Sequence, residues 1–137
     1  MIKEIRKDPL FLSQKSLKAT KEDLVVIEDL KDTIKAHANT CVGMAANMIG
    51  YLKCIIVIFD EKGYLTMVNP MIMKQSGKLY ETKEGCLCHE GVRPVKRYEK
   101  IKVQYLDESF KPKIKTFSGF QAQIIQHEMD HCNGILI

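Results

Sequence analysis

The sequence lacks several features that define whole classes of proteins. It has no run of about 18 apolar residues, so no membrane-spanning helix is expected. Its first residues, MIKEIRKDPL, contain no apolar core of a signal peptide, and we expect a cytoplasmic protein. There is no internal repeat, low-complexity segment or linker. These absences favour a single domain over residues 1–137.

The basic residues are not clustered, and the cysteines do not have the regular spacing of a disulfide-bonded domain. Lys and Arg total 21 against 17 Asp and Glu, a net charge of +4, and the basic residues are scattered along the chain. No specific nucleic-acid partner is therefore predicted. The five cysteines are an odd number without disulfide-like spacing, which fits a reducing compartment. A domain of this size buries roughly two-thirds of its unfolded surface, so it does not need disulfides to fold.

The first half of the chain predicts a helix and a buried strand. T-K-E-D at Thr20 resembles a capping box, and apolar residues then recur at helical spacing, so we expect a helix from about Lys21 to His37. His37 should lie at the surface, at the end of this helix. The small-residue segment CVGMAANMIG is expected to be a loop. CIIVIF (Cys54–Phe59) is rich in β-branched residues and predicts a buried strand.

The second half predicts more strands and a final helix. YLTMVNP should form a strand that ends, or lies at a sheet edge, at Pro70, because proline cannot donate to a central ladder. KLYETKEG, KIKVQYLD and KPKIKTF are three further strand candidates. S-G-F-Q at Ser118 resembles a capping box, and the helix after it should run to about Cys132, before Asn133-Gly134. This organisation predicts an α+β domain.

The final predicted helix contains QHEMDH. His127 and His131 are four residues apart, so both imidazoles project from one helix face and can bind one divalent metal ion. Glu128 flanks that face, where a carboxylate can act as a general base toward water. This is the H-E-x-x-H pattern. Surface histidines that match it by accident are the alternative, but two of the chain's four histidines lie in this motif.

A catalytic metal site needs a third protein ligand and an open position. The stretch KEGCLCHEGVR offers five candidates within seven residues, namely Glu84, Cys86, Cys88, His89 and Glu90. A cysteine thiolate would bind zinc or ferrous iron strongly. Spacing alone does not choose among the candidates. The alternative for the two cysteines is that they are small buried hydrophobic residues on a strand.

Three segments together resemble the peptide deformylase family, which carries G-x-G-x-A-A-x-Q, E-G-C-L-S and Q-H-E-x-D-H in this order. Here they read CVGMAANMIG, EGCLC and QHEMDH, and the resemblance spans nearly the entire chain. It implies antiparallel sheets packed around a C-terminal metal-binding helix. It also implies that Cys86 joins His127 and His131 as metal ligand, that Glu128 is the general acid and base, and that the Leu87 N–H helps to hold the oxyanion.

The resemblance further implies an activity. The family removes the formyl group from N-formylmethionyl nascent peptides and releases formate. Its cofactor is one divalent metal ion, usually Fe²⁺ in the cell, although Zn²⁺, Ni²⁺ or Co²⁺ can occupy the site. A small-residue segment around Gly43 would let the peptide backbone approach closely and pair like an added strand.

The first motif departs from the family pattern. Met48 stands where the family has a glutamine whose amide donates to the oxyanion, and a thioether has no donor. Losing one such donor costs roughly 10²–10³ in turnover. Asn47 carries an amide that a shift of the loop could bring in instead. The chain is therefore expected to be either an active deformylase or a weakened, deformylase-like protein that binds metal and peptide.

The second motif departs as well. Cys88 replaces the family's serine, either as a tolerated near-isostere or as an oxidisable thiol beside the metal ligand. A general H-E-x-x-H metallopeptidase is a further alternative, as is a closed structural metal site with Cys88 or His89 as fourth ligand. Arg93 is expected to orient the loop that carries Cys86, to contact the peptide, or to form a plain surface salt bridge.

Overall fold

The chain forms short helices, one long helix in each half, and five strands, described over residues 1–137 in a computed structural model. No helix combines the length and the hydrophobicity that crossing a membrane requires. In chain order the elements are α1 (Pro9–Leu12), the 3₁₀-helix η1 (Lys21–Asp23), α2 (Leu24–Ala36), β1 (Gly43–Ala45), the 3₁₀-helix η2 (Ala46–Ile49), β2 (Ile55–Asp60), β3 (Gly63–Gly85), β4 (Val92–Leu106), β5 (Pro112–Ser118) and α3 (Gly119–Cys132).

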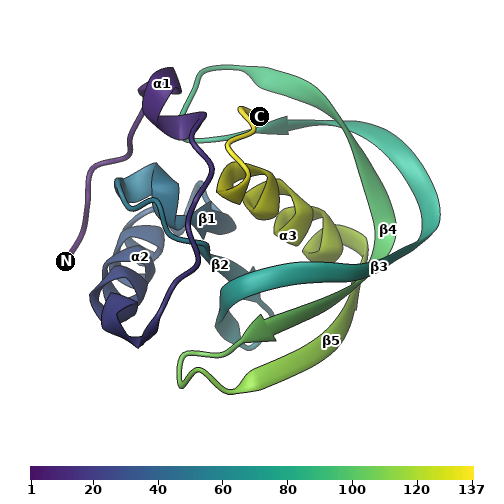
Figure 1. Ribbon diagram of the computed structural model, residues 1–137. Coiled ribbons are helices and arrows are strands. Elements are labelled where there is room, and N and C mark those ends of the chain that lie inside the picture. Colours follow the sequence, from purple (N-terminus) through teal and green to yellow (C-terminus); the bar gives the residue numbers. More distant parts are fainter.

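The five strands form one antiparallel sheet in the order β1-β2-β3-β4-β5. β3 and β4 are long, and Figure 1 shows them curving around α3. Three register irregularities interrupt their pairing, and such bulges bend strands and increase their twist. β1 and β2 lie between α2 and α3 (Figure 1). The predicted α+β fold, with antiparallel strands packed around the C-terminal helix, is confirmed.

The predicted capping box at Thr20 is present. The Thr20 N–H donates to Asp23 Oδ2 at 2.8 Å, and the Glu22 N–H donates to Thr20 Oγ1 at 3.3 Å. The first turn is a 3₁₀-helix, so the α-helix itself begins at Leu24. His37 is half-buried at its end, with Nδ1 2.9 Å from the Thr33 carbonyl oxygen.

Pro70 does not end its strand, so one part of that prediction is wrong. β3 continues from Gly63 to Gly85, but its pairing with β2 stops at Val68. Asn69 has a φ of 50°, at a register shift between β3 and β4. Pro70 therefore lies where the ladder is already interrupted and its missing N–H costs little.

Three further local predictions also need correction. The segment expected to be a loop contains β1 and η2, and Gly43–Ala45 pairs with β2. Ser118 makes no capping hydrogen bond. Gly119, the first residue of α3, has a φ of 62°, a left-handed conformation outside the helical range that a capping box requires there. β4 begins at Val92, well before the predicted KIKVQYLD.

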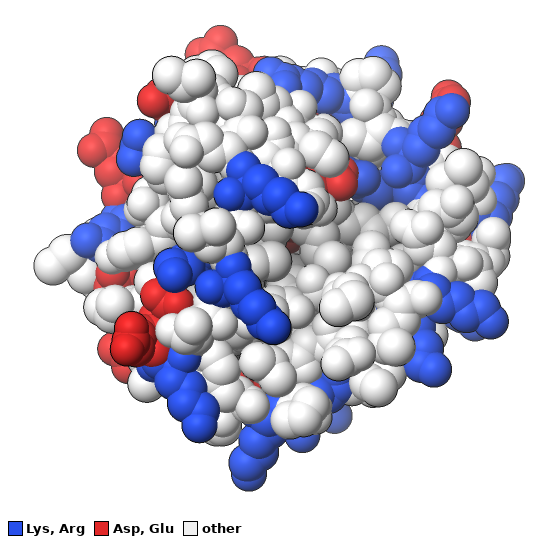
Figure 2. All heavy atoms as spheres, viewed as in Figure 1, with Lys and Arg blue, Asp and Glu red and all other residues white.

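A core of 24 buried hydrophobic residues fills the space between the helices and the sheet. Ile55–Ile58 of β2 are fully buried, as the β-branched run predicted. On the face drawn in Figure 2, the Lys and Arg side chains are spread out and do not gather into one patch. α3 differs from the other helices because its buried side includes four polar side chains, namely Gln126, His127, Glu128 and His131. These polar groups need partners inside the protein.

Candidate metal centre

The two histidines of α3 point to the same place, as their spacing predicted. His127 and His131 are 7% and 0% exposed. Their Nε2 atoms lie 3.2 Å apart, and the rings meet edge to face. Gln126, the residue before them, holds this part of α3 against β4: it accepts from the Tyr98 N–H and donates to the Tyr98 carbonyl, both at 2.9 Å.

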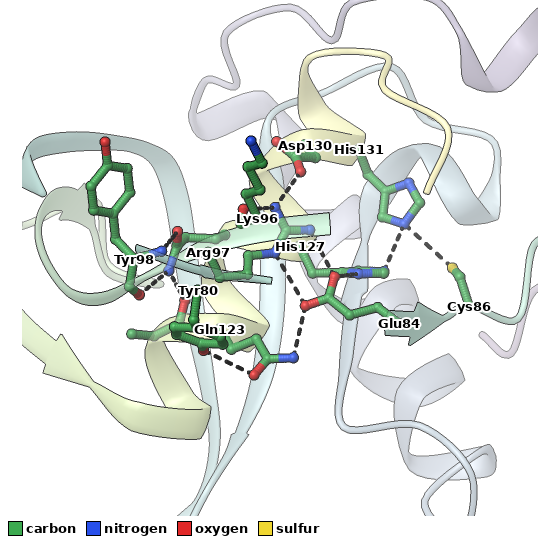
Figure 3. A network of polar contacts seen from close by, with 12 residues as sticks. Tyr80, Glu84, Cys86, Lys96, Arg97, Tyr98, Gln123, His127, Asp130 and His131 are labelled. Atoms are coloured by element: carbon green, nitrogen blue, oxygen red, sulfur yellow. Dashed lines mark hydrogen bonds and ion pairs between the residues drawn. The ribbon is translucent and has the colours of Figure 1, made fainter. Parts of the chain in front are cut away.

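Cys86 comes to the histidines from the end of β3. The strand stops at Gly85, and the Cys86 Sγ lies 3.3 Å from His131 Nε2 (Figure 3). Cys88 lies behind it, with the two sulfur atoms 3.2 Å apart. The possible ligand atoms of His127, Glu128 and His131 form one group, and those of Cys86, Cys88 and His131 form another. His131 therefore joins both groups.

The spacing of these atoms fits a metal ion. A tetrahedral ion with ligand bonds of about 2.0–2.3 Å sets neighbouring ligand atoms roughly 3.3–3.7 Å apart, close to the 3.2 and 3.3 Å distances from His131 Nε2. His131 Nε2 makes both of these contacts, to Cys86 and to His127. An imidazole nitrogen carries either one lone pair or one N–H, so it cannot form two good hydrogen bonds at once. Cys86, His127 and His131 also form the thiolate and imidazole set that suits zinc or iron.

Glu84 is placed behind His127 instead of among the ligand atoms. Its Oε1 lies 2.7 Å from His127 Nδ1, which leaves Nε2 facing the centre. Arg97 makes a bidentate pair with Glu84, through Nη2 at 2.7 Å and Nε at 3.1 Å, and also binds Asp130 at 2.7 Å. Burial would raise the pKa of Glu84, but hydrogen bonds from His127 and Arg97 outweigh it and lower the pKa to about 2.

The other ionisable groups of the centre are strongly perturbed. Burial lowers the pKa of His127, but its contacts with Cys86 and Glu84 outweigh this and raise it to about 10. The hydrogen bond from Cys88, together with burial, raises the pKa of Cys86 to about 11. A bound cation would instead lower the pKa of the Cys86 thiol. Burial raises the pKa of Glu128 to about 7, which suits a group that must both accept and donate a proton at neutral pH.

A cavity of about 560 Å³ opens onto these groups. It is lined by Cys86, Leu87, His127 and Glu128, and also by Gly43 and Met48. Glu128 Oε1 is buried and has no hydrogen-bond partner in the chain. The Leu87 N–H has no acceptor in the chain either. A proton acceptor and a backbone donor are thus both available beside the ligand cluster.

Gly43 and Met48 both line the cavity, but in different ways. A Cβ at Gly43 would lie 2.8 Å from Glu128 Oε2 and 2.7 Å from Ile124 Cγ2, so any larger residue would have to displace these side chains. Met48 is 1% exposed, and its Sδ accepts from the Ala45 N–H at 3.5 Å. Met48 thus supplies an acceptor to its own turn and no donor to the cavity.

Asn47 does not replace the missing donor. Its side chain is buried outside the cavity lining, and its amide nitrogen donates to the His131 carbonyl oxygen at 3.0 Å. The prediction that Asn47 supplies an oxyanion donor is therefore wrong for this arrangement. Asn47 instead ties η2 to the end of α3.

The remaining residues of the second motif do not join the ligand cluster with His127. Cys88 groups with Cys86 and His131 only. His89 lines the cavity, but its Nδ1 lies 3.0 Å from the Glu90 carbonyl oxygen. Arg93 fits none of its three predicted roles. It donates to the Leu136 carbonyl oxygen at 2.7 Å and so holds the residues after α3 against β4.

Sequence reasoning missed the network that holds Glu84. It consists of Arg97, Asp130, Gln123 and Tyr80, from three different elements (Figure 3). These residues belong to none of the three motifs except Asp130, whose contact with Arg97 spans 33 positions. Only Glu84 carried a signal, because it opens the EGC segment.

The chain is similar to known proteins over nearly its whole length. A model of the polypeptide deformylase family matches residues 2–137. The peptide deformylase of Clostridium beijerinckii is 56% identical over all of both chains. The fold is similar to the peptide deformylase of Legionella pneumophila, with a TM-score of 0.89 and 35% identity over 99% of this chain and 83% of that one.

A second solved structure is a class I type b peptide deformylase from Acinetobacter baumannii with Met-Ala-Ser bound. It has a TM-score of 0.88 and 27% identity over 99% of this chain and 97% of that chain. The family match thus extends over nearly the whole sequence, and the fold agrees over the same length. This chain belongs to the polypeptide deformylase family.

Proposed function

We propose that this chain is a metal-dependent hydrolase that removes the formyl group from N-formylmethionyl peptides and releases formate. The observation that carries the proposal is the convergence of Cys86, His127 and His131 beside the unpartnered Glu128 carboxylate, at the wall of one cavity. Membership of the deformylase family gives the reaction, and nascent peptides in the cytoplasm are the proposed substrates.

Cys86, His127 and His131 would hold one divalent ion, and Glu84 would keep His127 turned toward it. When bound, the ion supplies Lewis-acid chemistry that polarises a carbonyl and makes water a better nucleophile at neutral pH. We propose Fe²⁺ as the ion in the cell, with Zn²⁺, Ni²⁺ or Co²⁺ able to occupy the site. A thiolate and two imidazoles are compatible with each of these ions.

Glu128 moves the proton. Its unpartnered Oε1 is free to accept a proton from the attacking water, and the same oxygen can then donate it to the departing amine. A pKa raised to about 7 by burial allows both steps at neutral pH. The free Leu87 N–H would donate to the oxyanion.

The peptide would lie along β1, which is the edge strand of the sheet. An extended peptide can add to such an edge through backbone hydrogen bonds. Gly43, at the start of β1, has no side chain and packs directly against Glu128. Apolar residues of the cavity, among them Phe120 and Ile124, would contact a methionine side chain.

The test is formate release from a formyl-methionyl tripeptide by protein loaded with iron under anaerobic conditions, or with nickel. Wild-type protein should release formate, and Glu128→Gln should lose at least about 10³-fold in turnover while it keeps its metal. The same tripeptide with a free amino terminus is the control, and its cleavage would indicate a general peptidase. A metal-loaded wild-type chain that releases no formate would disprove the proposal.

A further inference from the structure

Two side chains outside the three motifs complete the hydrogen bonding of Glu84. Gln123 Nε2 donates to Glu84 Oε2 at 2.9 Å, and the Tyr80 hydroxyl donates to Gln123 Oε1 at 3.0 Å. Figure 3 shows the resulting chain of contacts from Tyr80 through Gln123 and Glu84 to His127. Gln123 lies one helical turn before His127 on α3, so both side chains reach the same carboxylate.

The direction of these hydrogen bonds follows from chemistry. Arg97 donates to both oxygens of Glu84, which therefore act as acceptors, so the Gln123 amide turns its nitrogen toward Glu84. The amide oxygen then faces Tyr80, whose hydroxyl has to donate to it. The Tyr80 hydroxyl thus holds the Gln123 amide in the orientation that Glu84 requires.

Gln123 is also a cavity-lining side chain that donates to Glu84. Both residues line the cavity, whereas Tyr80 does not. Apart from Gln123, the only hydrogen-bond donor to Glu84 Oε2 is Arg97 Nε, at 3.1 Å. Loss of the amide would expose that oxygen to water from the cavity and loosen the carboxylate that orients His127.

We propose that Gln123, held in one orientation by Tyr80, is a positioning residue for the metal centre. It keeps Glu84 directed at His127 Nδ1, and thereby keeps His127 Nε2 directed at Cys86 and His131. The proposal rests on the metal site described under the proposed function. It assigns a role to two residues that touch no metal ligand themselves and act only through Glu84.

Tyr80→Phe is the decisive variant, because it removes one hydroxyl and Tyr80 cannot touch substrate. Gln123→Met removes the amide at similar volume, and Tyr98→Phe is the matched control, since the Tyr98 hydroxyl on β4 has no hydrogen-bond partner. Each protein would be loaded with Co²⁺. Its visible absorption spectrum and the rate of Co²⁺ release to excess chelator would then be measured.

We expect release to be about 3-fold faster in Tyr80→Phe and about 10-fold faster in Gln123→Met, with a shifted Co²⁺ spectrum in both. The double variant should match Gln123→Met alone, because Tyr80 acts through Gln123. Tyr98→Phe should behave like the wild type. With the formylated tripeptide, Tyr80→Phe should lower kcat and leave KM unchanged.

Two results would overturn the positioning role. One is wild-type release and an unchanged spectrum in both single variants. The other is an additive effect in the double variant, which would mean that Tyr80 acts by another route. Metal release is measured without peptide, so a wild-type chain that binds Co²⁺ but releases no formate would overturn the proposed activity and leave this test intact.

Discussion

The sulfur atom of Cys88 lies 3.2 Å from that of Cys86, the proposed metal ligand. Cys88 is 3% exposed, and the Cys86 side of the pair faces the cavity. The two thiols are thus in contact at the one position where oxidation would remove a ligand. This arrangement follows directly from the cysteine that stands in place of the family's serine.

We therefore predict that peroxide inactivates the protein reversibly. Oxidation of the two thiols would form one S–S bond while hydrogen peroxide is reduced to two molecules of water. Cys86 would then no longer bind metal. Peroxide-treated wild-type protein should lose its metal, show a mass lower by two hydrogen atoms, and recover after dithiothreitol and metal are added. Cys88→Ser should form no such bond, and an equal, reversible loss of metal in that variant would contradict the prediction.

Met48→Gln tests the missing oxyanion donor. The amide would restore an N–H beside the cavity, and its oxygen could still accept from the Ala45 N–H as the Met48 sulfur does. We expect kcat to rise about 10²-fold with no change in metal content, in line with the usual effect of one such donor. Met48→Leu is the control of similar size and should keep the wild-type kcat. Equal turnover in Met48→Gln and the wild type would show that the donor is not needed.

The two long helices and the convergence of His127 and His131 were predictable because their signals are local. The H-E-x-x-H spacing of His127 and His131 depends only on helix geometry, and the apolar period of α2 depends only on one buried face. Glu84 was noticed but expected as one of several possible ligands. Its position behind His127 depends on a contact that spans 43 positions in the chain.

The errors arose where tertiary contacts override local rules. Asn69 takes a left-handed conformation because its side chain pairs with the Ala19 backbone at 2.8 and 3.0 Å, and this lets β3 continue past Pro70. The sequence leaves the Asn47 amide free, whereas in the fold it donates to the His131 carbonyl oxygen. In both cases the deciding partner lies at least 50 residues away.

Asp29 should make stability depend on pH in the acid range. It is 4% exposed and receives the Met1 ammonium at 2.9 Å and the Tyr51 hydroxyl at 2.8 Å. The ammonium and the hydroxyl lower the pKa of Asp29 in spite of burial. A depressed folded pKa gives stability that is present above the unfolded pKa of about 3.9 and is lost as the pH falls below it.

Asp29→Asn should therefore destabilise the protein at pH 7 and reduce the fall in melting temperature between pH 5 and pH 3, as measured by circular dichroism. Asp32→Asn is the matched control, because Asp32 binds the same ammonium but its side chain is 50% exposed. Asp32→Asn should change the melting temperature less than Asp29→Asn does at every pH. A melting curve of Asp29→Asn that follows the wild type across this range would contradict the assignment.

Gly43→Ala should separate the proposed general base, Glu128, from the proposed metal ligands. The new Cβ would press on Glu128 Oε2 and Ile124 Cγ2, and Ile124 lies within the packed core, so the Glu128 carboxylate has to move. A misplacement of about 1 Å in a catalytic group costs about 10²-fold in rate, so kcat should fall by roughly that factor while Cys86, His127 and His131 still bind metal. Gly85→Ala is the control, because a Cβ there meets only ordinary contacts at 3.6 and 3.7 Å. Metal content and kcat would be measured for both. A kcat for Gly43→Ala equal to that of Gly85→Ala would show that Glu128 tolerates the displacement and that its position does not limit the reaction.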